Sequence, residues 1–160
     1  MTNAAEMLAK LESLALNAGN TIMRIYSEGF VTKYKDDYSP VTEADTIAEK
    51  IIIAGLSSLT PEIPVVAEEA FSSGHSPDIS GGRFWLVDPL DGTKEFVEKN
   101  GEFTVNIALI EDGRPVCGIV HAPALSQTYT GHIKKGAHCR DVNNNRHKIR
   151  VRKVSKNGVT

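Results

Sequence analysis

The sequence predicts an α+β fold in which two N-terminal helices pack on a mainly antiparallel sheet. Apolar residues recur at spacings of three and four through residues 3–26 and again after Thr42, which is the periodicity of amphipathic helices. The second half of the chain instead holds short runs of strand-forming residues separated by turn signals. Helices followed by an antiparallel meander are typical of α+β proteins.

The first predicted helix covers residues 3–26, and Gly29, just past its end, is a candidate cap. A short strand and a polar loop are expected over residues 30–40. The second helix is expected to begin near Thr42, because threonine is a good N-cap and acids in the following turn suit the helix dipole. The segment Thr-Pro-Glu-Ile-Pro then ends this helix.

Several strands are predicted after the second helix. Residues 65–69 are expected to form a short buried strand that runs into two acids, and residues 72–82 a surface loop. Residues 83–87 form the next predicted strand, which the Asp-Pro-Leu-Asp motif should end. A hairpin follows, because an Asp-Gly turn signal joins two apolar runs, and further short strands are expected beyond Gln127.

Size and composition fit one soluble globular domain. The chain has 160 residues, of which 41% are hydrophobic and 24% are charged, so it can bury a core. The aliphatic run at 51–54 is far too short to cross a bilayer, and the N-terminus lacks the apolar region of a secretory signal. Two cysteines, Cys117 and Cys139, do not make a disulfide framework, so the cytoplasm is the expected location.

Charge is distributed unevenly along the chain. The formal net charge is −2, but residues 1–133 carry −10 and residues 134–160 carry +8. A basic tail of this kind can bind nucleic acid or a membrane surface. The alternative, a solvated strand-and-turn region over an acidic body, is favoured because no aromatic residue follows Tyr129 to stack on a base. We therefore expect no nucleic acid polymer as a partner.

The stretch WLVDPLDGTKEF, residues 85–96, places two aspartates at the end of an apolar run. The tight turn between Asp88 and Asp91 can point both carboxylates and the carbonyl of Leu90 to one side. Glu68 arrives at the end of another predicted strand. Such an all-oxygen pocket suits Mg²⁺, and two ions would clamp the attacking and leaving oxygens of a phosphoryl displacement.

Gly92 and Thr93 continue the same motif. Glycine lets the backbone approach an anion closely, and consecutive N–H groups at a helix start would cradle phosphate oxygens. The Thr93 hydroxyl would orient the attacking water or relay its proton, with Asp45 as the acceptor. Asp-Pro and Asp-Gly are also ordinary turn dipeptides. The convergence of separate strand ends, each carrying an acid, favours a site.

Taken together, these motifs resemble the inositol monophosphatase-like family of metal-dependent phosphatases. The similarity rests on DPLDGTKEF, on VTEAD upstream of it and on VVAEEA between them. The segments NGEFTVNIALI and GIVHAPAL are most similar to the bacterial 3′(2′),5′-bisphosphate nucleotidase branch. The resemblance extends from the first helix to about residue 135 and involves several motifs, which makes it specific.

The resemblance implies a role for each candidate site residue. The family's magnesium ligands match Glu68, Asp88, Asp91 and the carbonyl of Leu90, and its substrate contacts match Glu68, Leu90, Asp91, Gly92 and Thr93. The pair that activates the attacking water matches Thr93 and Asp45. Lys33 and Lys35 match the family's lysine-bearing loop only loosely and are left outside the predicted site. Of the two adjacent acids, Glu68 is taken as the ligand and Glu69 is not.

The resemblance also implies an activity and its setting. It implies hydrolysis of adenosine 3′,5′-bisphosphate, a by-product of sulfate assimilation, to AMP and phosphate, with two or three Mg²⁺ ions and inhibition by lithium. The location implied is the cytoplasm, with peripheral association at the inner face of the cell membrane as a further option. Alternatives are an inositol-phosphate or sugar-phosphate phosphatase, or a non-catalytic remnant that binds metal or anions.

One feature of the family has no match in this sequence. The family's chains are longer and carry a second α/β domain with a W-D-x-A-A-G motif, which completes the second metal site. Residues 1–160 are therefore expected to be the N-terminal metal- and phosphate-binding domain alone, with the second metal site incomplete and activity weak or absent. We also expect an exposed apolar surface, with a homodimer as one way to cover it.

Overall fold

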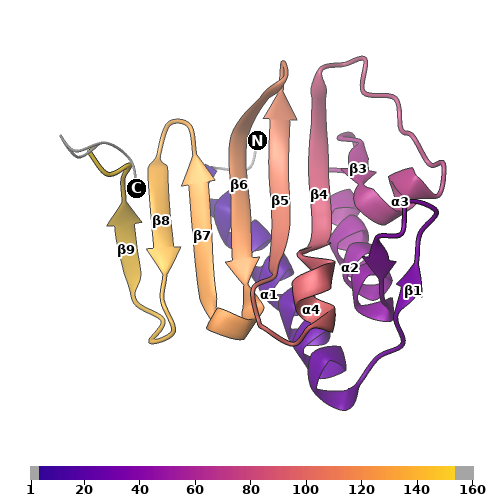
Figure 1. Ribbon diagram of the computed structural model, residues 1–160. Helices are drawn as coiled ribbons and strands as arrows, with labels where there is room; N and C mark the ends of the chain where they lie inside the picture. Colours follow the sequence, from indigo (N-terminus) through magenta and orange to yellow (C-terminus); the bar gives the residue numbers. More distant parts are fainter. Residues whose placement is uncertain (1–3, 154–160) are drawn as a thin grey trace.

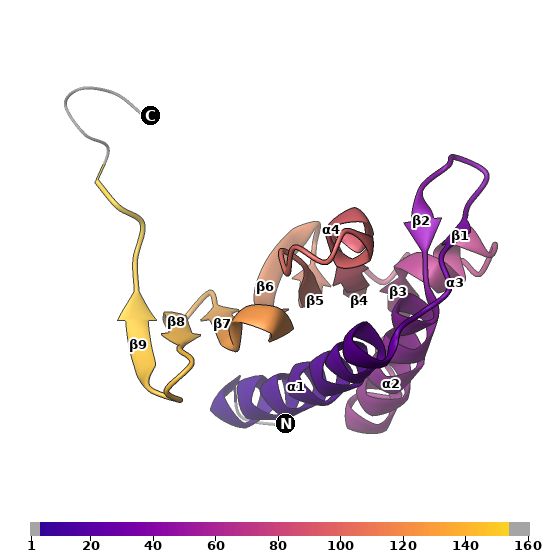
Figure 2. The same cartoon turned by 60° about the horizontal axis from the view of Figure 1, so that its bottom comes forward.

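The computed structural model describes residues 4–153 of the chain. Helices α1 (Ala4–Glu28) and α2 (Glu43–Leu59) lie side by side on one face of a seven-stranded sheet (Figures 1 and 2). Helix α1 packs mainly on the middle of the sheet, while α2 packs toward the edge where the sheet begins. The predicted α+β fold with two N-terminal helices is confirmed.

The strands of the large sheet are hydrogen-bonded in chain order. They are β3 (Val65–Ala67), β4 (Arg83–Asp91), β5 (Thr104–Glu111), β6 (Arg114–Ala122), β7 (Gln127–His132), β8 (Gly136–Arg140) and β9 (Arg146–Ile149). Neighbouring strands are antiparallel except β3 and β4, which run parallel. Small elements complete the fold: a hairpin of β1 (Lys33–Tyr34) and β2 (Pro40–Val41), and the short helices α3 (Glu68–Ser72), α4 (Thr93–Val97) and η1 (Pro123–Leu125).

The ends of both long helices follow their predicted signals. Gly29 adopts φ 101°, and its N–H donates to the carbonyl of Ile25, which closes α1 as expected of a glycine cap. Thr42 has extended backbone angles, and its hydroxyl accepts from the N–H of Ala44 at the start of α2. Local sequence therefore sets where these helices begin and end.

An aromatic cluster ties α4 to the end of α1. Phe96 lies with its ring centroid 5.1 Å from that of Tyr26, 4.6 Å from Phe30 and 5.2 Å from Phe103. Phe96 and Phe103 are fully buried. Aromatic side chains bury large areas, so this cluster anchors the short helix that follows the Asp-Pro-Leu-Asp motif.

The opposite face of the sheet is not covered by the two long helices (Figure 2). It exposes Leu86, Val120, Tyr129 and Ile133, and a shallow, mainly apolar groove of about 640 Å³ runs along it. An exposed apolar surface was expected from the sequence, and this groove provides one. The homodimer stays a prediction. No helix within residues 4–153 is long and apolar enough to span a bilayer.

Two boundaries differ from the predictions. The acids at 68 and 69 do not end a strand but begin α3, because a side chain from α2 accepts hydrogen bonds from the N–H groups of that helix start. Strand β4 also continues through the Asp-Pro-Leu-Asp motif to Asp91. Its pairing with β5 shifts register between Asp88 and Asp91, so a bulge accommodates the motif.

The basic region after residue 133 forms β8, β9 and their turns at the far edge of the sheet. Every residue of β9 is exposed, as a solvated strand-and-turn region requires. Residues 154–160 of the predicted basic tail lie outside the described residues. Binding to nucleic acid is not tested by this arrangement.

Candidate active site

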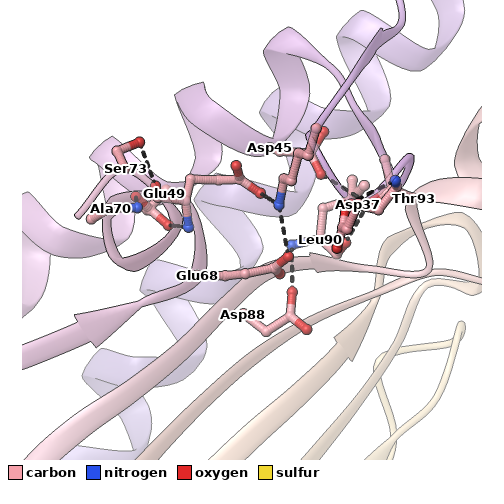
Figure 3. Close-up of polar contacts among 12 residues, drawn as sticks. Asp37, Asp45, Glu49, Glu68, Ala70, Ser73, Asp88, Leu90 and Thr93 are labelled. Atoms are coloured by element: carbon pink, nitrogen blue, oxygen red, sulfur yellow. Dashed lines mark hydrogen bonds and ion pairs between the residues drawn. The ribbon is translucent and has the colours of Figure 1, made fainter. Parts of the chain in front are cut away.

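Several predicted site residues lie together near the ends of β3 and β4, and Figure 3 shows Asp45, Glu68, Asp88, Leu90 and Thr93 there. Because these strands are parallel and Ala67 pairs with Val87, the next residues lie side by side: Glu68, which begins α3, and Asp88, which is still in β4. Their side chains point toward each other in Figure 3. Parallel pairing, which sequence analysis did not anticipate, thus brings two acids 20 positions apart to one place.

Asp45 lies in the first turn of α2 and is only 2% exposed. Its Oδ2 accepts hydrogen bonds from the N–H of Thr42 at 2.8 Å and from the Thr42 hydroxyl at 2.7 Å. Its Oδ1 accepts from the Thr93 hydroxyl at 3.0 Å. Burial raises the pKa of Asp45, although these hydrogen bonds partly oppose the shift. Asp45 therefore caps its own helix and connects it to α4.

Thr93 is placed by the left-handed turn that precedes it. Gly92 has φ 94°, and a Cβ added there would lie 2.9 Å from the carbonyl oxygen of Glu102. Only glycine fits this conformation and this close approach. The Thr93 hydroxyl also lies 3.2 Å from the carbonyl oxygen of Leu90, which gives it a second acceptor besides Asp45.

Asp88 is the most strongly perturbed acid of the site. Burial, repulsion by the charges of Glu68 and Asp91, and a hydrogen bond with Glu68 together raise the pKa of Asp88 to about 7. The N–H of Leu90 donates to Asp88 Oδ1 at 3.2 Å and opposes this shift only in part. The carboxylates of Glu68 and Asp91 thus lie close enough to repel that of Asp88, and a bound cation would relieve this repulsion.

Asp91 is held from the neighbouring strand. The side-chain amide of Asn106 on β5 donates to Asp91 Oδ2 at 3.1 Å, and Asn106 lies opposite Asp88 in the β4–β5 register. Sequence reasoning missed this residue. Its signal was a polar residue inside the apolar strand 103–110, which becomes informative only once the register is known.

Lys35 also belongs to this cluster, although sequence reasoning left it outside the site. Its Nζ lies 2.9 Å from Glu68 Oε1 and 2.7 Å from Glu69 Oε1. Burial lowers the pKa of Lys35, but hydrogen bonds and charge interactions with Glu69 and Glu68 outweigh burial and raise the pKa above its ordinary value. The β1–β2 hairpin thus brings a cation to the carboxylates. Lys33, which was also left out, is exposed.

Glu49 is a second residue that sequence reasoning missed. It is 6% exposed, and its carboxylate accepts from the N–H of Glu69 at 2.7 Å and from the N–H of Ala70 at 2.9 Å (Figure 3). Burial raises its pKa, and these two hydrogen bonds oppose the shift. The available signal was its spacing, because Glu49 follows Asp45 by one turn of α2.

The donor set fits a hard divalent cation. It consists of the carboxylates of Glu68, Asp88 and Asp91 and the carbonyl of Leu90, all oxygen ligands. Within residues 4–153, no three Asp, Glu, His or Cys side chains already stand in metal-binding geometry. The Lys35 ammonium instead contacts Oε1 of Glu68, so a cation from this chain already lies beside the proposed ligands.

Comparison with known proteins places the chain in a family. The family model described as "Inositol monophosphatase family" matches residues 3–159. This chain belongs to the inositol monophosphatase family. Among curated relatives, it is similar to the 3′(2′),5′-bisphosphate nucleotidase CysQ of Salmonella typhimurium, with 52% identity over 125 residues, and to that of Escherichia coli K12, with 48% identity over 126 residues. These alignments cover 77% and 78% of this chain but only 50% and 51% of the relatives.

Solved structures of this family share the fold. SuhB from Mycobacterium tuberculosis matches 96% of this chain with a TM-score of 0.74 at 27% identity, and CysQ from Bacteroides thetaiotaomicron matches 84% with a TM-score of 0.61 at 33% identity. The chain covers 55% and 48% of those two structures. It thus spans about half the length of the relatives that it matches.

Proposed function

We propose that residues 1–160 form the metal- and phosphate-binding domain of a Mg²⁺-dependent 3′(2′),5′-bisphosphate nucleotidase. The proposed reaction is hydrolysis of adenosine 3′,5′-bisphosphate to AMP and phosphate. The observation that carries the proposal is the meeting of the Thr93–Asp45 hydrogen bond with the cluster of Glu68, Asp88 and Asp91 at one end of the sheet. The names of the curated relatives support the substrate class.

In this proposal the cation-binding residues are Glu68, Asp88, Asp91 and the carbonyl of Leu90. When bound there, Mg²⁺ supplies Lewis-acid polarisation of the phosphate ester. The raised pKa of Asp88 supports this assignment, because burial, its largest cause, and the nearby charges of Glu68 and Asp91 all disfavour the ionised carboxylate when no cation is present. A second Mg²⁺ site is proposed to be incomplete within these residues, as the family resemblance implies.

Thr93 and Asp45 are proposed to handle the proton of the attacking water. The Thr93 hydroxyl donates to Asp45 Oδ1, so its oxygen can accept a proton from water while its own proton moves to the carboxylate. Burial makes Asp45 a better proton acceptor, since it raises the pKa of this carboxyl. The water oxygen forms a bond to phosphorus as the phosphorus–oxygen bond to the nucleoside breaks, and the leaving oxygen takes a proton from solvent.

Substrate contacts are proposed for Gly92 and Thr93, together with Glu68, Leu90 and Asp91. Gly92 makes a left-handed turn at the start of α4, and N–H groups at such a turn suit phosphate oxygens. The apolar groove on the uncovered sheet face includes Asp88 and Asn106 in its lining, so it reaches this site. Inhibition by lithium, a role in sulfate assimilation and a cytoplasmic location are further proposals that rest on family resemblance.

The test is an assay of phosphate release by this chain from adenosine 3′,5′-bisphosphate, inositol 1-phosphate and fructose 1,6-bisphosphate, each with Mg²⁺ and with a chelator. We expect turnover by this chain to be weak, to be faster for the nucleotide than for the other two substrates, and to stop with the chelator. Faster turnover of inositol 1-phosphate would favour the alternative phosphatase. Because the chain spans half the length of its relatives, a non-catalytic domain is the second candidate. Mg²⁺ binding without turnover of any substrate would favour it.

A further inference from the structure

Helix α2 carries two buried acids on one face. Asp45 is 2% exposed and Glu49 is 6% exposed, and their spacing of four residues places them one helix turn apart. Burying a carboxylate is unfavourable unless hydrogen bonds satisfy it. Asp45 is satisfied by Thr42 and Thr93, so its burial is explained by the site already described. The Glu49 carboxylate instead accepts its hydrogen bonds from backbone amides of α3.

Glu49 closes the start of α3 from outside that helix. Ala67, at the N-cap position, provides no side-chain hydrogen bond. The first N–H groups of any helix lack partners within the helix, so they need acceptors from elsewhere. Glu49 Oε2 accepts from the N–H of Glu69, and its Oε1 accepts from the N–H of Ala70. A carboxylate at a helix N-terminus makes strong, charge-assisted bonds.

These two hydrogen bonds fix the backbone that carries Glu68. Glu68 is the first residue of α3, directly before the two amides that Glu49 holds. Its own side chain is exposed and contacts two other side chains, the ammonium of Lys35 and the carboxyl of Asp88. The position of the Glu68 side chain depends on this backbone as well as on those contacts, and Glu49 is the side chain that anchors the backbone to α2.

We propose that Glu49 is a positioning residue, which fixes the first turn of α3 through the amides of Glu69 and Ala70 and so holds Glu68 beside Asp88. This inference rests on the proposed function, in which Glu68 binds the cation. In this arrangement α2 supports both halves of the site. One turn holds Thr93 through Asp45, and the next turn holds Glu68 through Glu49.

The test compares Glu49→Gln with a matched control, Glu12→Gln. The amide keeps the size of Glu49 but turns one acceptor into a donor that faces a backbone N–H. Glu12 is also a buried acid, at 9% exposure, but it lies on α1 and pairs with Arg140. Mg²⁺ affinity is measured by calorimetry, the free energy of unfolding by urea titration, and exchange of the Glu69 and Ala70 amides by NMR.

Glu49→Gln is expected to weaken Mg²⁺ binding by about tenfold or more, as loss of a residue that orients a metal ligand does. Exchange of the Glu69 and Ala70 amides should become faster. Glu12→Gln should lower the free energy of unfolding and leave both the Mg²⁺ affinity and these amides unchanged. A purely structural role for Glu49 would instead lower stability without a selective loss of affinity.

Unchanged Mg²⁺ affinity in a folded Glu49→Gln chain would overturn the inference while leaving the proposed function standing. If that variant does not fold, Glu49→Asp takes its place, because its shorter carboxylate keeps the charge but cannot reach both amides. It too must bind Mg²⁺ more weakly than the unmodified chain, and equal affinity would overturn the inference. An unmodified chain that binds no Mg²⁺ would overturn the proposed metal site itself, a result recognisable without any variant.

Discussion

The charged side chains at the two edges of the seven-stranded sheet differ in their burial. Beside β3 and β4, acids such as Asp45 and Glu49 are buried, and each accepts hydrogen bonds from fixed groups. At the β9 edge, basic residues such as Arg146 and Lys148 are exposed to solvent. Within residues 4–153, no buried side-chain nitrogen or oxygen lacks a hydrogen-bond partner.

This difference separates charges that organise a site from charges that only face water. A buried carboxylate has a high cost if its partner is lost, so it constrains the positions of the elements that it joins. An exposed lysine or arginine loses little when its neighbours change. The acids beside β4 therefore fix the positions of the elements around the candidate site, whereas the basic residues of the β9 edge mainly contribute surface charge.

The largest effect is expected from Asp45→Asn. Three donors depend on the Asp45 carboxylate, namely the Thr42 N–H, the Thr42 hydroxyl and the Thr93 hydroxyl. We expect phosphate release to fall by about a hundredfold or more, because the proton acceptor is lost. The free energy of unfolding should fall by about 2–3 kcal/mol, measured by urea titration. A fully stable variant with undiminished turnover would refute the role assigned to this buried acid.

A smaller effect is expected from pH on the metal-free chain. Burial and repulsion raise the pKa of Asp88 from an ordinary 3.8 to about 7, so the folded chain holds this proton more tightly than the unfolded chain. The resulting stabilisation is complete below the pKa that Asp88 has in the unfolded chain. It is lost as the pH rises through the pKa that Asp88 has in the folded chain.

Between about pH 5 and about pH 8, the metal-free chain should therefore lose about 1–2 kcal/mol of its free energy of unfolding through Asp88, since solvent screens part of the interaction. Asp88→Asn should remove most of this pH dependence, because its side chain does not ionise. Urea titrations of both chains at the two pH values, with a chelator present, measure the difference. An equal change in the free energy of unfolding between the two pH values in both chains would contradict a raised pKa of Asp88.

The smallest effect is expected at the basic edge. Replacing both Arg146 and Lys148 with Gln removes two exposed charges from β9. The free energy of unfolding should change by less than about 0.5 kcal/mol, and the Mg²⁺ affinity should stay the same. A loss comparable to that of Asp45→Asn would show that the exposed edge is also organised by specific partners.

The two regions also differ in how far the sequence predicts them. Local signals correctly located α2 and its Thr42 cap, and the expected neighbours Asp45 and Thr93 are hydrogen-bonded. The catalytic roles of these residues stay predictions. The predicted strand over residues 65–69 was wrong at its end, because residues 68 and 69 begin α3, whose amides are satisfied by Glu49, about 20 positions earlier in the chain. The spacing of Glu49 from Asp45 marks it as a residue on the same helix face, but it does not reveal that its partners are the amides of α3.

Lys35 shows the same limit. Its contact with Glu68 joins residues 33 positions apart, and it depends on how the β1–β2 hairpin folds over α3. The parallel pairing of β3 with β4, which brings Glu68 beside Asp88, is equally non-local. Residue types and short motifs indicated the chemistry of the site, whereas its supporting contacts depend on the tertiary structure.

The central claim is that the carboxylates beside β4 form a cation site that requires Asp88. Calorimetric titration of Mg²⁺ into this chain and into Asp88→Asn at about pH 8, where Asp88 is ionised, tests it most directly. We expect saturable Mg²⁺ binding by the unmodified chain and at least about tenfold weaker binding by the variant, because a direct ligand is lost. Equal affinities in the two chains, or no binding by either, would contradict the claim.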